Sequence, residues 1–227
     1  MWSIAWKSDG RLIAGVGKSG TAYIWDPRSG KEPKISKLLP IQALKPARIR
    51  WVGEDIFLTS FSKTRNRQYS LLSGSSLSTT FTQNLDTNPG VLLPLVDEER
   101  KIIYVAGRGD MTLRQIELSG PQGYQETLHP LQFPLASASL AAIHPAKLDV
   151  MKAEISRILA PIVDKDGDSL LPVSIKVPRR QLIDFHEDLY PDLAGFGKLS
   201  SCPSSFDLLI TISSTRANGL RLAQGRR

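Results

Sequence analysis

Short runs of aliphatic, β-branched and aromatic residues recur along the chain in groups of three, separated by turn-forming residues. Glycine in these turns, as in Ser8-Asp9-Gly10 and Lys18-Ser19-Gly20, takes positive φ without strain, which is typical of tight turns between antiparallel strands. The pattern predicts strands at residues 3–6, 12–16 and 22–25; at 47–52, 56–61 and 67–72; at 90–96, 101–106 and 112–118; and, in a fourth group that begins near residue 136, at 154–159 and 172–177.

The groups repeat with a nearly constant period. They begin at residues 3, 47, 90 and 136, which are 44, 43 and 46 residues apart. A period of about 40–45 residues is that of a four-stranded β-propeller blade. More polar runs supply the fourth, outer strand of the first three units, at 35–39, 78–82 and 124–128. The sequence therefore predicts an all-β chain of about four propeller blades.

Two structural alternatives compete with this interpretation. A β-sandwich also strings short strands about 8–12 residues apart, but regularity at four-strand rather than one-strand spacing favours the propeller. Within the stretch 148–159, Ile155, Ile158 and Leu159 also suit one face of a helix. The repeat places a strand at this position, and we expect the strand.

Trp25-Asp26 ends the third strand of the first unit, where the WD dipeptide ends a strand in WD40 blades. In that structural role the tryptophan packs between neighbouring sheets, and the aspartate closes the next turn onto backbone N–H groups. The dipeptide alone is a weak signal, but at a strand end in a chain with this period it is much stronger. We therefore predict a WD40-type β-propeller.

Seven motifs, in the same order and at matching distances, resemble those of the coronin family of WD40 proteins. They are residues 20–31 (GTAYIWDPRSGK), 59–68 (TSFSKTRNRQ), 88–94 (NPGVLLP), 102–110 (IIYVAGRGD), 147–157 (KLDV and AEISR), 177–179 (VPR) and 187–192 (EDLYPD). The resemblance extends over residues 1–195, and residues 47–52 are similar to the long, tandem-propeller coronins.

The resemblance implies a seven-bladed ring of which this chain holds about four blades. We expect a partial propeller at residues 1–195 that lacks the family's opening blades, and a disordered, low-complexity basic tail at 196–227. Four blades wedged for sevenfold closure would leave apolar blade faces exposed. We therefore expect a fragment of a longer protein, unless a second chain completes the ring. No heptad pattern predicts the coiled coil with which coronins end.

Charge and cysteine content limit the classes of binding partner and the cellular compartments that fit this sequence. The formal net charge is +7, from 29 Lys+Arg and 22 Asp+Glu, which favours acidic partners such as an actin filament, an anionic lipid surface or nucleic acid. The resemblance selects the actin filament and other cytoskeletal or trafficking proteins, and it gives no reason to expect nucleic acid. No apolar run is long enough for a transmembrane segment, and the single cysteine, Cys202, fits a reducing compartment. We expect a protein of the cytoplasm and cytoskeleton.

No catalytic, cofactor-binding or metal-binding set emerges from the sequence. His129, His144 and His186 lie far apart, and the segment 164–168 (DKDGD) lacks the spacing of a calcium loop. The GKS at residues 17–19 precedes a predicted strand, whereas a phosphate-binding loop precedes a helix. We expect a binding protein rather than an enzyme.

The basic loop that joins the second and third strands of the second unit is the best candidate for a partner contact. It carries Lys63, Arg65 and Arg67. An ordinary solvated turn is the other interpretation, and both stay open. In the first, a rigid ring meets acidic actin subunits through basic loops. The alternative function is a propeller scaffold for vesicle or Golgi traffic that does not touch actin directly.

Overall fold

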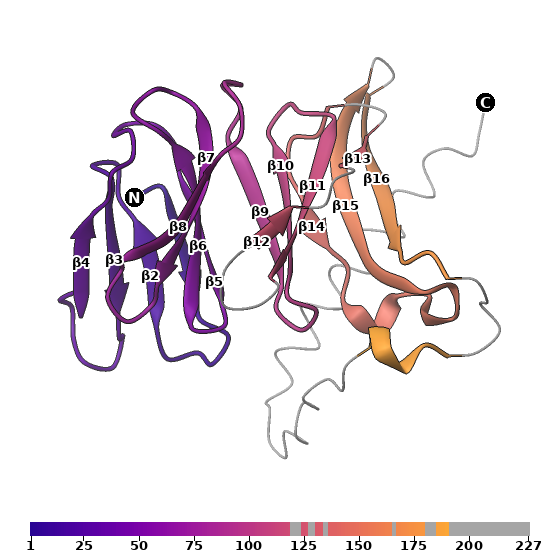
Figure 1. Ribbon diagram of the computed structural model, residues 1–227, viewed down its shortest axis with the longest axis horizontal. Helices are drawn as coiled ribbons and strands as arrows, with labels where there is room; N and C mark the ends of the chain where they lie inside the picture. Colours follow the sequence, from indigo (N-terminus) through magenta and orange to yellow (C-terminus); the bar gives the residue numbers. More distant parts are fainter. Residues whose placement is uncertain (119–123, 127–129, 134–135, 165–166, 180–184, 191–227) are drawn as a thin grey trace, which may run out of the picture. The chain divides into compact units, whose positions relative to one another are not determined.

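The computed structural model describes residues 1–118, 124–126, 130–133, 136–164, 167–179 and 185–190. The chain divides into two compact units, Met1–Pro191 and Asp192–Arg227. The second unit, and with it the tail predicted at 196–227 and the boundary at residue 195, lies outside the described residues. In the first unit the described elements are antiparallel β-strands and three single-turn 3-10 helices (Figure 1).

Three sheets have the strands expected of a propeller blade. The first consists of β1 (Ser3–Trp6), β2 (Ile13–Val16), β3 (Thr21–Trp25) and β4 (Ile35–Leu38); the second of β5 (Arg48–Val52), β6 (Asp55–Phe61), β7 (Arg67–Ser73) and β8 (Thr79–Asn84); the third of β9 (Leu92–Asp97), β10 (Ile102–Gly107), β11 (Thr112–Leu118) and β12 (Tyr124–Glu126), with β13 (Leu131–Gln132) also paired to β11. Apart from β13, the strands of each sheet form a meander in which strands adjacent in sequence pair. The predicted strands of these three units are confirmed to within a few residues.

The fourth sheet departs from the predicted repeat. Its described strands are β14 (Ala141–Ala142), β15 (Glu154–Asp164) and β16 (Gly167–Lys176), paired in that order. The first strand of this unit, expected to begin near residue 136, is short and irregular: among the described residues, Ser137 forms a single antiparallel bridge with Ile162, and the two-residue β14 follows. The strand expected at 154–159 is confirmed and runs on to Asp164.

The helix considered for 148–159 does not form: Ile155, Ile158 and Leu159 lie in β15, as the repeat predicts. Two single-turn 3-10 helices, η1 (Pro145–Lys147) and η2 (Val150–Lys152), precede the strand. Ala153 then takes a left-handed conformation with a φ of 52°, which ends η2 and turns the chain into β15. At the far end of β15, Asp164 pairs with Gly167 of β16. Residues 165–166, the middle of the calcium-like segment, lie outside the described residues.

Consecutive sheets pack face to face, because alternate side chains along their strands are apolar. Three clusters of buried side chains join the first sheet to the second, the second to the third and the third to the fourth. They include, respectively, Ile24, Ile49 and Leu72; Phe57, Tyr69 and Ile103; and Tyr104, Leu113 and Ile158. This succession of packed meanders is the architecture that the repeat predicts.

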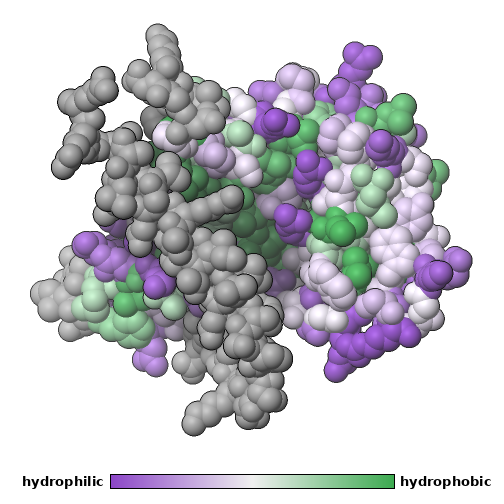
Figure 2. All heavy atoms as spheres, turned by 180° about the vertical axis from the view of Figure 1, so that it is seen from behind, coloured by the Kyte–Doolittle hydropathy of each residue, from purple (hydrophilic) through white to green (hydrophobic). Residues whose placement is uncertain are grey.

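The first sheet also carries apolar side chains that are largely exposed. Along β1 burial alternates: Ala5 packs against the core shared with the second sheet, whereas Ile4 and Trp6 are 60% and 55% exposed. Figure 2, which views the molecule from behind, shows apolar groups at the surface among hydrophilic side chains. An exposed apolar blade face is therefore present on this sheet, as the partial ring predicts.

A candidate partner-binding surface at the basic end of the sheets

One end of the first three sheets is a continuous layer of loops. Backbone hydrogen bonds connect each loop to the next: Leu44 N donates to Lys18 O at 2.9 Å, Gln42 N to Phe61 O at 2.8 Å, Arg67 N to Asp86 O at 2.7 Å, and Arg108 N to Val91 O at 2.8 Å. We call this layer the basic end. It comprises residues 17–20, 39–46, 62–66, 85–91 and 107–111.

The basic end is positively charged because its cations outnumber its anions and form no ion pairs with the described residues. Lys18, Lys63, Arg65 and Arg108 are exposed, and none of them forms an ion pair with another described residue. A fifth cation, Lys45, is half-buried, with its ammonium 5.5 Å from the centre of the Phe61 ring. The acidic residues of this layer, Asp86 and Asp110, are both bound by Arg67. The cations are therefore available to an acidic partner.

Lys63 and Arg65 project from a turn that its own polar groups hold in shape. Ser62 N donates to Asn66 O at 2.8 Å, and Asn66 N donates back to Ser62 Oγ at 3.1 Å. The Ser62 and Thr64 hydroxyls lie 2.8 Å apart. Because the backbone is fixed, only side-chain freedom is lost when these two cations meet a partner.

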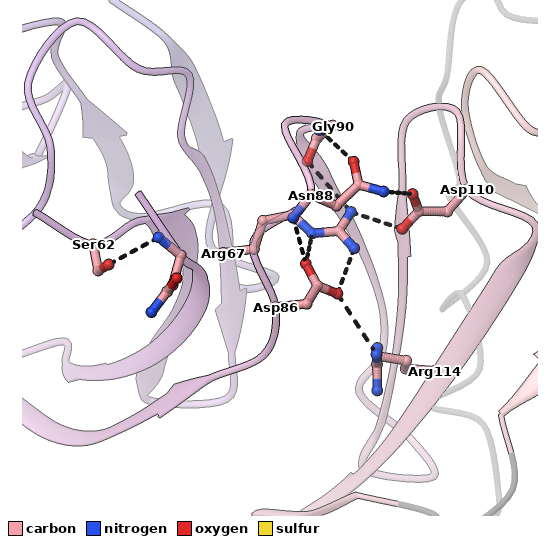
Figure 3. Close-up of polar contacts among 8 residues, drawn as sticks. Ser62, Arg67, Asp86, Asn88, Gly90, Asp110 and Arg114 are labelled. Atoms are coloured by element: carbon pink, nitrogen blue, oxygen red, sulfur yellow. Dashed lines mark hydrogen bonds and ion pairs between the residues drawn. The ribbon is translucent and has the colours of Figure 1, made fainter. Parts of the chain in front are cut away.

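Arg67, the third predicted contact residue, does not belong to the exposed surface. Its side chain is only 3% exposed and lies between the second and third sheets. Nε and Nη2 donate to the two carboxylate oxygens of Asp86, each at 2.6 Å, and Nη1 donates to Asp110 Oδ2 at 2.7 Å (Figure 3). A guanidinium bound by two carboxylates is not offered to another protein, so the prediction is corrected: Arg67 joins two sheets, and a partner contact stays a prediction for Lys63 and Arg65 alone.

The group around Arg67 extends into the loop that connects the second and third sheets. Asn88 Nδ2 donates to Asp110 Oδ1 at 3.1 Å, and Gly90 N donates to Asn88 Oδ1 at 2.9 Å (Figure 3). Arg114 Nη2 lies 3.7 Å from Asp86 Oδ2. We call Arg67, Asp86, Asn88 and Asp110 the clamp. It fixes the loop at 85–91 and the turn at 107–111 beside the turn that carries Lys63 and Arg65.

Glycine at position 107 leaves the space that the clamp needs. A Cβ there would lie 2.0 Å from Arg67 Nη1 and 2.2 Å from Asp110 Oδ2, far inside van der Waals contact. Any larger residue must therefore push the arginine and the aspartate apart. The glycine of the IIYVAGRGD motif is thus explained by close packing against the Arg67–Asp110 ion pair.

Charge pairing shifts the pKa values of two clamp residues, Arg67 and Asp86. The hydrogen bonds from Arg67 lower the pKa of Asp86 below its ordinary value, although partial burial opposes them. Burial alone would lower the pKa of Arg67, but the hydrogen bonds to Asp86 and Asp110 more than offset this, and its pKa is raised. Arg67 and Asp86 therefore both stay charged at neutral pH, and their ion pair is kept.

The predicted WD signature lies away from the basic end, at the turn between β3 and β4. Asp26 closes this turn as expected: its Oδ1 accepts a hydrogen bond from Arg28 N at 3.0 Å. Trp25 is half-buried and stacks on Tyr23, with ring centroids 5.2 Å apart, and its ring lies over Gly15 of the same sheet. Because Ala22 and Ile24 alternate with these rings, Trp25 covers the face of the first sheet opposite to the second sheet.

Two basic-end cations were missed although the repeat could have found them. Lys18, Lys63 and Arg108 are 45 residues apart in succession, and each lies in the turn between the second and third strands of its sheet. Equivalent turns of successive blades lie at the same end. A cation that recurs at the blade period therefore predicts a basic surface that extends over several blades. The local cluster of cations at 63–67 predicts a contact at one loop only.

Neither a metal site nor a membrane-spanning helix is found in the part of the chain that the structure describes. Its His, Cys, Asp and Glu residues form no group of three or more that could hold a metal ion. Among the same residues no helix is long and apolar enough to span a membrane. What this part does offer is a rigid surface of loops.

Comparison with known proteins supports the coronin resemblance. A family described as a type of WD40 repeat matches residues 170–198. Coronin-7 from Rattus norvegicus and Coronin-7 from Mus musculus are each 31% identical to this chain over 199 residues, which are 85% of this chain and 21% of the relative. The chain thus spans about a fifth of the length of these curated relatives, whose own length agrees with the resemblance to the long coronins.

Solved structures give the same result. The WD40 domain of Toxoplasma gondii coronin superposes with a TM-score of 0.75 at 26% identity, over 83% of this chain and 48% of that one. A chain of a mitotic checkpoint complex reaches a TM-score of 0.55 at 16% identity, over 78% of this chain and 49% of that one, and supports the fold alone. With its four antiparallel meanders and its relatives, the chain belongs to the coronin family and forms part of a WD40 β-propeller.

Proposed function

We propose that this chain acts as a coronin-like scaffold of the cytoplasm that binds actin filaments through its basic end. Membership of the coronin family supports a scaffold rather than a catalyst. The single observation that carries the proposal is the set of exposed cations Lys18, Lys63, Arg65 and Arg108 in one continuous layer of loops, none of which forms an ion pair with another described residue.

Electrostatic complementarity is the mechanism. Exposed cations in a rigid layer attract an acidic surface, raise the rate of encounter and orient the two partners. The clamp contributes indirectly, because it binds the acids that would otherwise neutralise Lys63 and Arg65. Such an interaction weakens with salt, since exposed charges are screened over about 8 Å at physiological ionic strength.

Co-sedimentation with filamentous actin tests the proposal. In the double variant Lys63→Glu/Arg65→Glu, two attractive contacts become repulsive, and we expect the affinity to fall by about tenfold or more at low salt. Stability should stay unchanged, because both side chains are exposed and unpaired.

The matched control is Arg28→Glu/Lys31→Glu. It makes the same change in net charge at two exposed cations of the β3–β4 turn, away from the basic end. Equal loss of affinity in both double variants would mean that only net charge matters. If the unaltered chain fails to pellet with filaments at low salt, actin binding is rejected, and a trafficking scaffold without direct actin contact takes its place.

A further inference from the structure

Leu44 is the most exposed large apolar side chain in the described part of the chain. It is 76% exposed and lies in the connection between β4 and β5, inside the basic end. Its backbone N–H donates to the Lys18 carbonyl at 2.9 Å, and its sequence neighbour Lys45 lies against Phe61 next to the Lys63 turn. A leucine is thus held at a fixed position among the cations of this surface.

The backbone of Leu44 is in a conformation that leucine disfavours. Its φ is 64°, in the left-handed region, which suits glycine and, to a lesser degree, asparagine. Leu77 gives a direct comparison: its φ is 53°, but its side chain is fully buried in the core between the first two sheets. Packing offsets the strain at Leu77. Leu44 has the same backbone strain, but its exposed side chain makes no packing contribution that would offset this strain in the free chain.

We propose that Leu44 is the apolar anchor of the basic end, and that it enters an apolar depression on an acidic protein surface. The inference rests on the proposed function and names that surface as part of the actin filament. A protein interface commonly has a buried apolar residue at its centre and a polar rim that excludes water. The surrounding cations orient the encounter, and burial of the leucine then slows dissociation.

An anionic membrane is the competing occupant, because it also accepts cations and a leucine. The rigid setting of Leu44 favours a protein: its backbone is fixed to the Lys18 loop, and a fixed side chain suits a shaped depression better than a fluid bilayer. Vesicles containing phosphatidylserine distinguish the two. Vesicle binding that requires Leu44, together with filament binding that does not, overturns the proposal.

The variant Leu44→Asn separates binding from stability in the full chain. Asparagine tolerates the left-handed conformation and removes the apolar surface. We expect the filament dissociation constant to rise about tenfold, while the midpoint of thermal unfolding stays the same or rises. Leu44→Met keeps an apolar side chain and should keep most of the affinity.

The control is Leu170→Asn, which removes another exposed leucine, 56% exposed, from β16 of the fourth sheet. Its filament affinity should equal that of the unaltered chain. If Leu44→Asn binds normally while Lys63→Glu/Arg65→Glu is weakened, the anchor is disproved and the proposed function stands. If the unaltered chain does not bind filaments, both are disproved. A lower unfolding midpoint in Leu44→Asn would contradict the strain argument.

Discussion

Two cations of one short segment, Arg65 and Arg67, have opposite environments. Arg65 is exposed and unpaired at the tip of a turn, whereas Arg67, two residues later, is buried between two sheets and bound by two carboxylates. The difference arises from residues that are distant in sequence, because Asp86 and Asp110 lie 19 and 43 residues beyond Arg67. A run of basic residues can therefore contain a structural ion pair and a binding surface side by side.

The comparison also shows how the two environments depend on each other. Without Arg67, Asp86 would keep the longer contact with Arg114, and Asp110 the hydrogen bond from Asn88, so both acids would offset the cations of the basic end. With Arg67 in place, its guanidinium neutralises both acids, and the exposed cations give the basic end a positive electrostatic potential. Stability experiments should therefore single out the clamp, and binding experiments should single out the exposed turn.

The largest effect on stability is expected from Arg67→Met. It leaves two partly buried carboxylates without their partner, and the free energy of unfolding should fall by about 3 kcal/mol. Urea unfolding measures this loss. Adding Asp86→Asn and Asp110→Asn to the same variant should recover part of it, since the uncompensated charges are removed. A loss no larger than that of an exposed arginine would refute the clamp as a stabilising feature.

A smaller loss is expected from Gly107→Ala, which breaks the clamp without removing a charge. The added methyl group must displace Arg67 Nη1 or Asp110 Oδ2, at a cost of about 2 kcal/mol in unfolding free energy. The neighbouring Arg108→Ala is the control and should change stability by less than about 0.5 kcal/mol. Similar stability of the two variants would show that the space around Gly107 is not needed.

Acid should weaken the clamp before it affects the exposed turn. The pKa of Asp86 is below 3.8 in the folded chain because of Arg67, so its contribution is present above about pH 4 and is lost as the pH falls through the lowered value. The difference in unfolding free energy between the unaltered chain and Arg67→Met should therefore shrink between pH 6 and pH 3. A constant difference over this range would mean that Asp86 does not respond to Arg67.

Glu154 provides a second acid-sensitive point, in the fourth sheet. Burial would raise its pKa, but hydrogen bonds from Arg157 and the Asp149 N–H outweigh burial and lower the pKa to about 2. Its contribution to stability is present above its ordinary value of 4.5 and is lost as the pH falls toward 2. Glu154→Gln should reduce the acid sensitivity of the fourth sheet, measured by hydrogen exchange of β15 and β16.

The fold was more predictable than the site, for a physical reason. Alternating apolar residues and turn glycines are local signals, and they located the strands of the first three sheets. The fourth sheet was predicted less well, because two 3-10 turns and the left-handed Ala153 interrupt the repeat, and no glycine marks the turn at Ala153. Whether a cation is exposed or paired depends on side chains brought in from other sheets, so the burial of Arg67 was missed.

The smallest effects on stability, and the largest on binding, are expected at the exposed turn. Replacing Lys63 or Arg65 by methionine should change the free energy of unfolding by less than about 0.5 kcal/mol, because neither side chain is paired or packed. Thermal and urea unfolding of the two single variants measure this. A loss comparable to that of Gly107→Ala would show that the turn belongs to the folded core and is not free for a partner.

We propose that the exposed cations of the basic end, rather than the buried clamp, contact the filament. The most direct measurement is filament affinity as a function of ionic strength for the unaltered chain and for Lys63→Glu/Arg65→Glu, with stability checked on the same samples. We predict that the filament affinity of the unaltered chain decreases steeply with salt and that the affinity of the variant decreases clearly less. The two proteins should have equal free energies of unfolding. Parallel salt dependences in the two proteins would contradict the account.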